Sequence, residues 1–193
     1  YFLRNSDIPK YIDNGVVDMA IIGENLLIEK DFDINVLKKL GFSKCKVSIA
    51  IPNNKEFNSI EDLNNLKIAT SYPNTLRKFL NIQNINANIH VINGSVEIAP
   101  NIGLSDAICD IVSSGSTLYK NNLKEVFILH ESQAVIAGNN PLNKIKKELI
   151  DKFLFRVNSV LKAKESKYIL LNAPNDKIDA ISFIMTNDKE FIY

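Results

Sequence analysis

Short apolar runs alternate with segments of helical character along this chain of 193 residues, and that alternation limits its fold more than any other feature of the sequence. The apolar runs are compact and rich in β-branched residues, which is typical of buried strands. Alternating strands and helices indicate an α/β fold. The pattern predicts helices over Ile8–Asn14, Ser59–Leu66, Thr75–Asn81 and Leu142–Lys162, and strands over Val17–Ile22, Val47–Ile51, Lys67–Thr70, Asn88–Ile92, Ala107–Val112 and in the extended region Phe127–Ala137.

The composition agrees with a soluble enzyme. With 46% hydrophobic residues the chain can bury a core, and its length allows one large or two small domains. The net charge of +1 provides no general attraction to nucleic acid or to a membrane surface. There is no signal peptide and no bilayer-spanning apolar run, and two cysteines without clustered histidines argue against a disulfide framework or a zinc site. We therefore expect a cytoplasmic protein with no nucleic-acid or membrane partner.

One charged residue, Asp110, interrupts the strand predicted over Ala107–Val112. A carboxylate in such a run is costly to bury unless it is paired or reaches into a site. The turn that follows combines a glycine, which allows close backbone approach, with hydroxyl donors, so it predicts a phosphate site. An ordinary strand-to-helix turn capped by serine would also explain a turn of this kind. Its residues are Ser113, Ser114, Gly115, Ser116 and Thr117.

The longer block from Glu97 to Leu118 favours the functional interpretation. It resembles the signature of ATP phosphoribosyltransferase, the enzyme that opens histidine biosynthesis, at each of its fixed positions: Glu97, Gly103, Ser105, Ile108, Asp110, Ser114, Gly115, Thr117 and Leu118. The resemblance extends over nearly the whole chain. It also includes Ser6–Tyr11, Gly15–Asn25, Ile68–Pro73, Gly94–Glu97 and Asn121–Glu125.

This resemblance implies a fold similar to type II periplasmic binding proteins, in which two α/β lobes are joined by two crossovers and the active site lies in the cleft between them. On that basis residues 1–50 and 125–164 form the first lobe, and residues 51–124 form the second lobe with the phosphoribosyl-binding loop. Residues 165–193 resemble the start of a C-terminal α+β regulatory domain, which binds histidine in the long form of the family. We expect a chain truncated at both ends.

The resemblance also implies an activity, the transfer of the phosphoribosyl group from phosphoribosyl pyrophosphate to N1 of ATP, with release of pyrophosphate. Residues 113–117 would hold the 5-phosphate, and Glu97 and Asp110 would contact the ribose hydroxyls as catalytic residues. Mg²⁺ would be carried chiefly by the pyrophosphate oxygens, without a dedicated protein site. Family members form homo-oligomers, as dimers or hexamers, and histidine inhibits those with a complete regulatory domain.

Three further residues are weaker candidates for contact with the nucleotide. Arg4 and Asp7 fall at an expected strand end that faces the cleft, although a surface ion pair explains them equally well. Tyr72 could stack or hydrogen-bond near the substrate, and packing beside Pro73 is its alternative. The remaining reactive side chains are interpreted as structural, namely Cys109, His90 and His130.

Two other functions stay open on the sequence. A non-catalytic ligand-binding module could have the same two-lobed fold, because a fold does not fix a function. A catalytically silent relative that serves as a partner subunit is the other alternative. The phosphoribosyl-type loop favours the enzyme over both.

Overall fold

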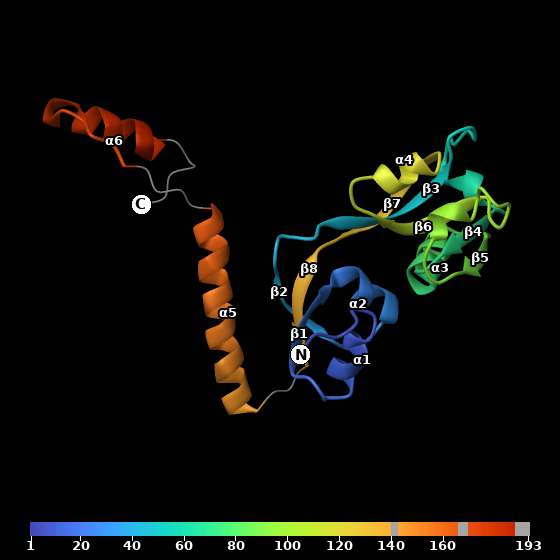
Figure 1. Ribbon diagram of the computed structural model, residues 1–193, viewed down its shortest axis with the longest axis horizontal. Helices are drawn as coiled ribbons and strands as arrows, with labels where there is room; N and C mark the ends of the chain where they lie inside the picture. The colour runs from blue at the N-terminus through green and yellow to red at the C-terminus, as the bar shows by residue number, and fades with distance from the viewer. Residues whose placement is uncertain (140–142, 166–169, 188–193) are drawn as a thin grey trace. The chain divides into compact units, whose positions relative to one another are not determined.

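The computed structural model describes residues 1–139, 143–165 and 170–187, and it divides the chain into two compact units, residues 1–150 and 151–193. The first unit contains two sheets, and its short helices alternate with their strands along the chain (Figure 1). Its elements are α1 (Ile8–Asp13), β1 (Met19–Gly23), α2 (Glu24–Lys30), β2 (Asn35–Lys39), β3 (Cys45–Pro52), η1 (Ile60–Leu63), β4 (Lys67–Thr70), α3 (Pro73–Ile82), β5 (Asn88–Val91), η2 (Val96–Ile98), β6 (Ala107–Val112), α4 (Ser116–Lys120), β7 (Leu123–Ser132) and β8 (Ala134–Gly138).

The two sheets define two lobes within this unit. The small lobe holds a three-stranded antiparallel sheet of order β1-β8-β2 together with α1 and α2. The large lobe holds a five-stranded mixed sheet of order β5-β4-β6-β3-β7 together with α3 and α4. Two short connections join the sheets, residues 40–44 between β2 and β3 and Gln133 between β7 and β8. The lobe boundaries expected from the sequence stay a prediction.

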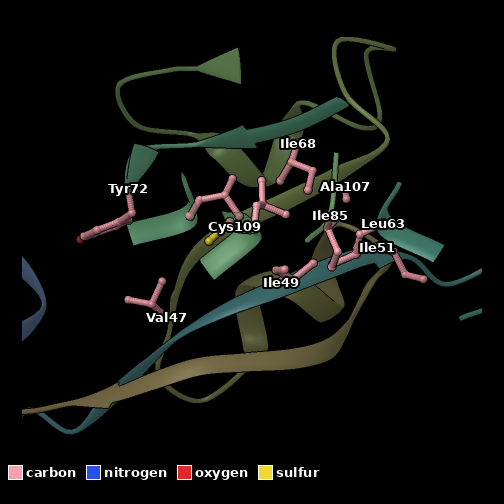
Figure 2. Close-up of a cluster of buried hydrophobic side chains, with 11 residues drawn as sticks. Val47, Ile49, Ile51, Leu63, Ile68, Tyr72, Ile85, Ala107 and Cys109 are labelled. Carbon is pink, nitrogen blue, oxygen red and sulfur yellow. The ribbon is translucent and has the colours of Figure 1, made fainter. Parts of the chain in front are cut away.

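The large lobe buries apolar side chains on both faces of its sheet, because successive residues of a strand point to opposite faces. On one face, residues of β3, β4 and β6 pack against α3, as Figure 2 shows for Val47, Ile49, Ile68 and Cys109. On the other face, a second cluster packs under η2 and α4; it contains Ala50, Ala69, Val96, Ala99, Ile108, Val112, Leu118 and Leu123. Cys109 points to the first face, and its neighbour Asp110 therefore points to the second face, together with Ile108 and Val112.

Most predicted elements are confirmed, and the departures have identifiable causes. The helix expected over Ser59–Leu66 is only the 3₁₀ turn η1, because Asn65 adopts a left-handed φ of 63° and turns the chain directly into β4. The sequence analysis missed β2, whose residues are largely exposed and which pairs only with β8. It also missed α2, which has seven residues and directly follows β1 without a linking turn.

The second unit begins within α5 (Lys144–Glu165), which the sequence predicted over nearly the same residues, and continues through η3 (Asn175–Lys177) and α6 (Ile178–Asn187). Its assignment to a regulatory domain stays a prediction, and residues 166–169 and 188–193 of that segment lie outside the described residues. No helix in the described part of the chain is both long and apolar enough to cross a bilayer.

Candidate functional site

The turn predicted to hold phosphate connects β6 to α4. Gly115 has a φ of +75°, in the left-handed region that glycine adopts without a steric penalty, and α4 begins at the next residue. The Oγ atoms of Ser114 and Ser116 are 3.0 Å apart, and the backbone N–H of Ser116 lies 3.4 Å from the Oγ of Ser114. Hydroxyl and backbone donors are thus gathered on one tight turn, as an anion site requires.

The sequence-predicted catalytic pair and the phosphate turn line a single pocket of about 150 Å³. Glu97 reaches it from η2, which lies over β6 because the neighbouring Val96 is fully buried in the cluster on that face. Asp110 reaches it from β6 itself, on the same face of the sheet. The lining residues are Glu97, Ile108, Asp110, Ile111, Val112, Ser113, Ser114, Gly115, Ser116, Thr117 and Leu118.

The electrostatics of this pocket centre on the two carboxylates. Burial raises the pKa of the Asp110 carboxyl above its usual value, and the negative charge of Glu97 raises it further, while a hydrogen bond from the backbone N–H of Ile111 lowers it. A half-buried carboxylate without a cationic partner is costly to the fold and suits a site that supplies hydroxyl donors from a ligand. The pair can therefore accept hydrogen bonds from a polyol.

A second pocket, of about 380 Å³, shares Ser113 with the first and is rich in lysine. Lys39 pairs with Glu24 at 2.9 Å, and Lys46 pairs with Glu125 at 2.8 Å. Lys44 has no ion pair within the part of the chain that the structure describes. The pocket draws on both lobes and on the connections between them; its lining residues are Glu24, Lys39, Lys44, Cys45, Lys46, Ser113, Glu131, Ser132 and Gln133.

The sequence analysis missed this lysine-lined pocket. Its only local signal is three lysines within residues 39–46, a spacing that also fits a solvated connection between strands. Glu131, Ser132 and Gln133 are far away in the sequence and reach the pocket because β7 pairs with β3, where Cys45 is the partner of Ser132.

The three weaker candidates lie outside both pockets. Arg4 and Asp7 precede α1 in an exposed segment that forms no strand within the described residues, and their place at a strand end stays a prediction. Tyr72 is buried at the edge of the core cluster of the large lobe (Figure 2). Its Oη accepts a hydrogen bond of 2.9 Å from Asn25 Nδ2. Burial raises its pKa to about 12. Nucleotide contact by these residues stays a prediction.

The structural interpretation of Cys109 is confirmed. Its side chain is fully buried in the main core, and burial raises the pKa of its thiol to about 12, which disfavours the thiolate form of Cys109. His130 lies in β7 with its Nε2 buried and without a hydrogen-bond partner among the described residues. Burial lowers the pKa of this imidazole.

Comparison with known proteins identifies the family. The profile of ATP phosphoribosyltransferase matches residues 4–159. The chain belongs to the ATP phosphoribosyltransferase family. It is 50% identical over 188 residues to the ATP phosphoribosyltransferase of Bacteroides thetaiotaomicron, and 50% identical to that of Parabacteroides distasonis. In both comparisons the match covers 97% of this chain and 66% of the relative, so the chain spans slightly less than two thirds of the length of these enzymes.

Solved structures confirm the predicted type II periplasmic-binding-protein-like fold. The ATP phosphoribosyltransferase (HisG:HisZ) complex of Thermotoga maritima is 27% identical with a TM-score of 0.75, and the match covers 84% of this chain and 79% of that one. A substrate-binding protein of an amino acid ABC transporter gives 17% identity and a TM-score of 0.58, with 84% and 71% covered. At that identity the second likeness concerns the fold alone.

Proposed function

We propose that this chain catalyses the reaction of its family, the transfer of the phosphoribosyl group of phosphoribosyl pyrophosphate to N1 of ATP, the first step of histidine biosynthesis. One observation carries the proposal. Seven of the nine signature residues named above, all except Gly103 and Ser105, line one pocket that combines a phosphate-type turn with two carboxylates. A phosphorylated sugar needs both kinds of group at that spacing.

Residues 113–117 hold the 5-phosphate through backbone N–H groups and serine and threonine hydroxyls. Glu97 and Asp110 accept hydrogen bonds from the ribose hydroxyls. Displacement at the anomeric carbon builds positive charge on the ribose ring, so carboxylates beside the ring stabilise the transition state more than the ground state. The reaction needs no protein nucleophile, in keeping with the buried thiol of Cys109.

The lysine-lined pocket holds the polyphosphate part of the substrates. Ser113 belongs to both pockets, so a ligand whose 5-phosphate and ribose occupy the first pocket can extend into the second. Lys44 offers an ammonium group that is not engaged elsewhere in the described structure. A pyrophosphate or triphosphate group bound there would be neutralised as bonds to it break.

Mg²⁺ fits this arrangement as an ion held mostly by substrate oxygens. Proteins commonly bind Mg²⁺ through one or two carboxylates together with substrate phosphates, and Glu97 and Asp110 supply such a pair. Within the described residues no group of three or more His, Cys, Asp and Glu side chains could hold a metal by itself. When bound with the substrate, the ion would offset the charge of the departing pyrophosphate.

Assembly and regulation are proposed from the family alone. We expect a homo-oligomer, and we expect histidine to inhibit where a complete regulatory domain is present. Neither property depends on the pocket described above.

The test combines binding with turnover. Titration calorimetry should detect phosphoribosyl pyrophosphate binding in the presence of Mg²⁺, and an assay of pyrophosphate release should detect turnover with ATP. Asp110→Asn and Glu97→Gln should each lower turnover by about 10 to 1,000-fold, as expected when a preorganised polar contact is removed. Glu56→Gln, which makes the same chemical change at an exposed position, is the matched control. Binding without turnover would favour the ligand-binding module.

The role of the lysine-lined pocket has its own measurement. Lys44→Gln should weaken the binding of inorganic pyrophosphate, while Lys10→Gln, an exposed position on α1, should leave it unchanged. Ribose 5-phosphate lacks the pyrophosphate, so its affinity should be the same in both variants. Equal pyrophosphate affinity in Lys44→Gln and the unsubstituted protein would remove the pocket from the proposal.

A further inference from the structure

A buried carboxylate of the small lobe caps a helix of the large lobe. Glu29 lies in the last turn of α2 and is 4% exposed. Its Oε1 accepts the backbone N–H of Asn74 at 3.0 Å, and its Oε2 accepts that of Thr75 at 2.8 Å. In return, the side-chain amide of Asn74 donates to the backbone oxygen of Glu29 at 3.0 Å. Three hydrogen bonds therefore join the end of α2 to the start of α3.

These bonds fill a role that α3 cannot fill for itself. The first N–H groups of a helix have no partner within the helix and are normally capped by a nearby side chain of the same segment. The residue before α3 is Tyr72, which makes no side-chain cap. The cap thus comes from another lobe, and a buried carboxylate that loses it would stay uncompensated. Each partner depends on the other being in place.

A second buried contact lies beside the first and leads toward the candidate site. Asn25 of α2 donates from Nδ2 to Tyr72 Oη at 2.9 Å and accepts at Oδ1 from Ser132 Oγ at 3.1 Å. The backbone N–H of Tyr72 donates to Thr70 Oγ1, which in turn donates to the backbone oxygen of Cys109, the neighbour of Asp110. Tyr72 therefore links α2 to the strand that carries Asp110, through a hydrogen bond at its hydroxyl and another at its backbone N–H.

We propose that Glu29 and Asn25 are positioning residues that fix the large lobe against the small lobe. The phosphate turn and its carboxylates belong to the large lobe, whereas Glu24 and Lys39 of the lysine-lined pocket belong to the small lobe. The contact therefore sets where Glu24 and Lys39 lie relative to the phosphate turn. The geometric part of this inference stands without the proposed function, and only its consequence for turnover rests on that function.

The geometric test measures a distance between the lobes by pulsed electron resonance in the 193-residue chain. Spin labels are placed at Asn14→Cys, after α1, and at Asn81→Cys, in α3, on a Cys45→Ser background; Cys109 is buried and stays unlabelled. Both label positions are exposed. Glu29→Ala should broaden and shift the distance distribution relative to that of the labelled protein that retains Glu29.

The matched control is Asp31→Asn. Asp31 and Lys78 form an ion pair of 2.7 Å between the same two segments, but both side chains are more than half exposed. Exposed pairs of this kind contribute little, so the distribution should not change. If Glu29→Ala fails to fold, Glu29→Gln takes its place, because it keeps the shape and one acceptor oxygen while losing the second acceptor and the charge.

Hydrogen exchange separates positioning from simple capping. Loss of the cap alone would speed exchange at the amides of Asn74 and Thr75 and leave the interlobe distance unchanged, and that result would overturn the proposal.

On the proposed function, Glu29→Gln should lower kcat by about 10 to 100-fold, since reacting groups displaced by about 1 Å lose that much. Ribose 5-phosphate, which needs only the large lobe, should bind as before. Unchanged kcat with a displaced lobe would argue against the proposed function and not against the contact.

Discussion

Replacement of Gly115 by valine should weaken phosphate binding more than it weakens the fold. Gly115 sits at φ +75°, and a Cβ built there would meet nothing within 4 Å. The whole cost is therefore that of holding a β-branched residue in a left-handed conformation, since no steric clash with a neighbour is added. That cost is about 1–2 kcal/mol for an ordinary L-residue and is larger for a β-branched one. The protein should remain folded.

In the variant, the loop can avoid this strain if the residue at position 115 adopts a negative φ. Such a change would turn the N–H groups that follow it, including that of Ser116, away from the pocket. Denaturant unfolding should give a loss of about 1–3 kcal/mol, while calorimetry with ribose 5-phosphate should give a clear loss of affinity. Gly115→Asn should retain most of both, because asparagine tolerates the left-handed region.

Gly15→Val separates strain from binding. Gly15 has a φ of +69° and equally open surroundings, but it follows α1 and lies in neither pocket. It should lose similar stability with no change in ribose 5-phosphate affinity. The reasoning is refuted if Gly115→Val binds as tightly as the unsubstituted protein, or if Gly15→Val weakens binding to the same extent.

Three further outcomes follow from burial. The raised pKa of Asp110 means that its ionised form destabilises the fold, so stability is lost as pH rises through the range between its unfolded and folded pKa values. Asp110→Asn should therefore be more stable than the unsubstituted protein at neutral pH and should lose that advantage in acid. Denaturant unfolding measured against pH tests this expectation. Leu76→Ala, at a fully buried position of α3, should cost about 2–5 kcal/mol in the same assay. A thiol reagent applied to the native protein should modify Cys45 and spare Cys109 until the protein is denatured, and mass spectrometry of the modified peptides would reveal a failure of this expectation.

Local patterns predicted the parts of the fold whose causes are local. The strand over Ala107–Val112 is predicted to the residue, because five apolar residues with one charged interruption leave few alternatives. The left-handed turn at position 115 also has a local cause, because glycine adopts a positive φ without a steric penalty. Where the deciding interaction lay elsewhere in the chain, local patterns failed, as at β2, whose exposed residues are strand only because β8 pairs with them.

The sequence by itself determined that the Asp110 carboxylate lies in a buried strand, where its burial costs free energy, and that a phosphate-type turn follows. Only the tertiary structure decided what faces that strand. Glu97 meets Asp110 because Val96 is buried against the sheet, and Ser132 meets Cys45 because β7 pairs with β3. The sequence left Tyr72 open between contact with a ligand and packing beside Pro73, and only the tertiary structure shows that its hydroxyl accepts a hydrogen bond from Asn25 of the other lobe. Contacts between residues far apart in the chain depend on how strands pair and which faces pack. The hydrophobic periodicity of one segment shows which of its faces is buried but does not identify the segment that packs against that face.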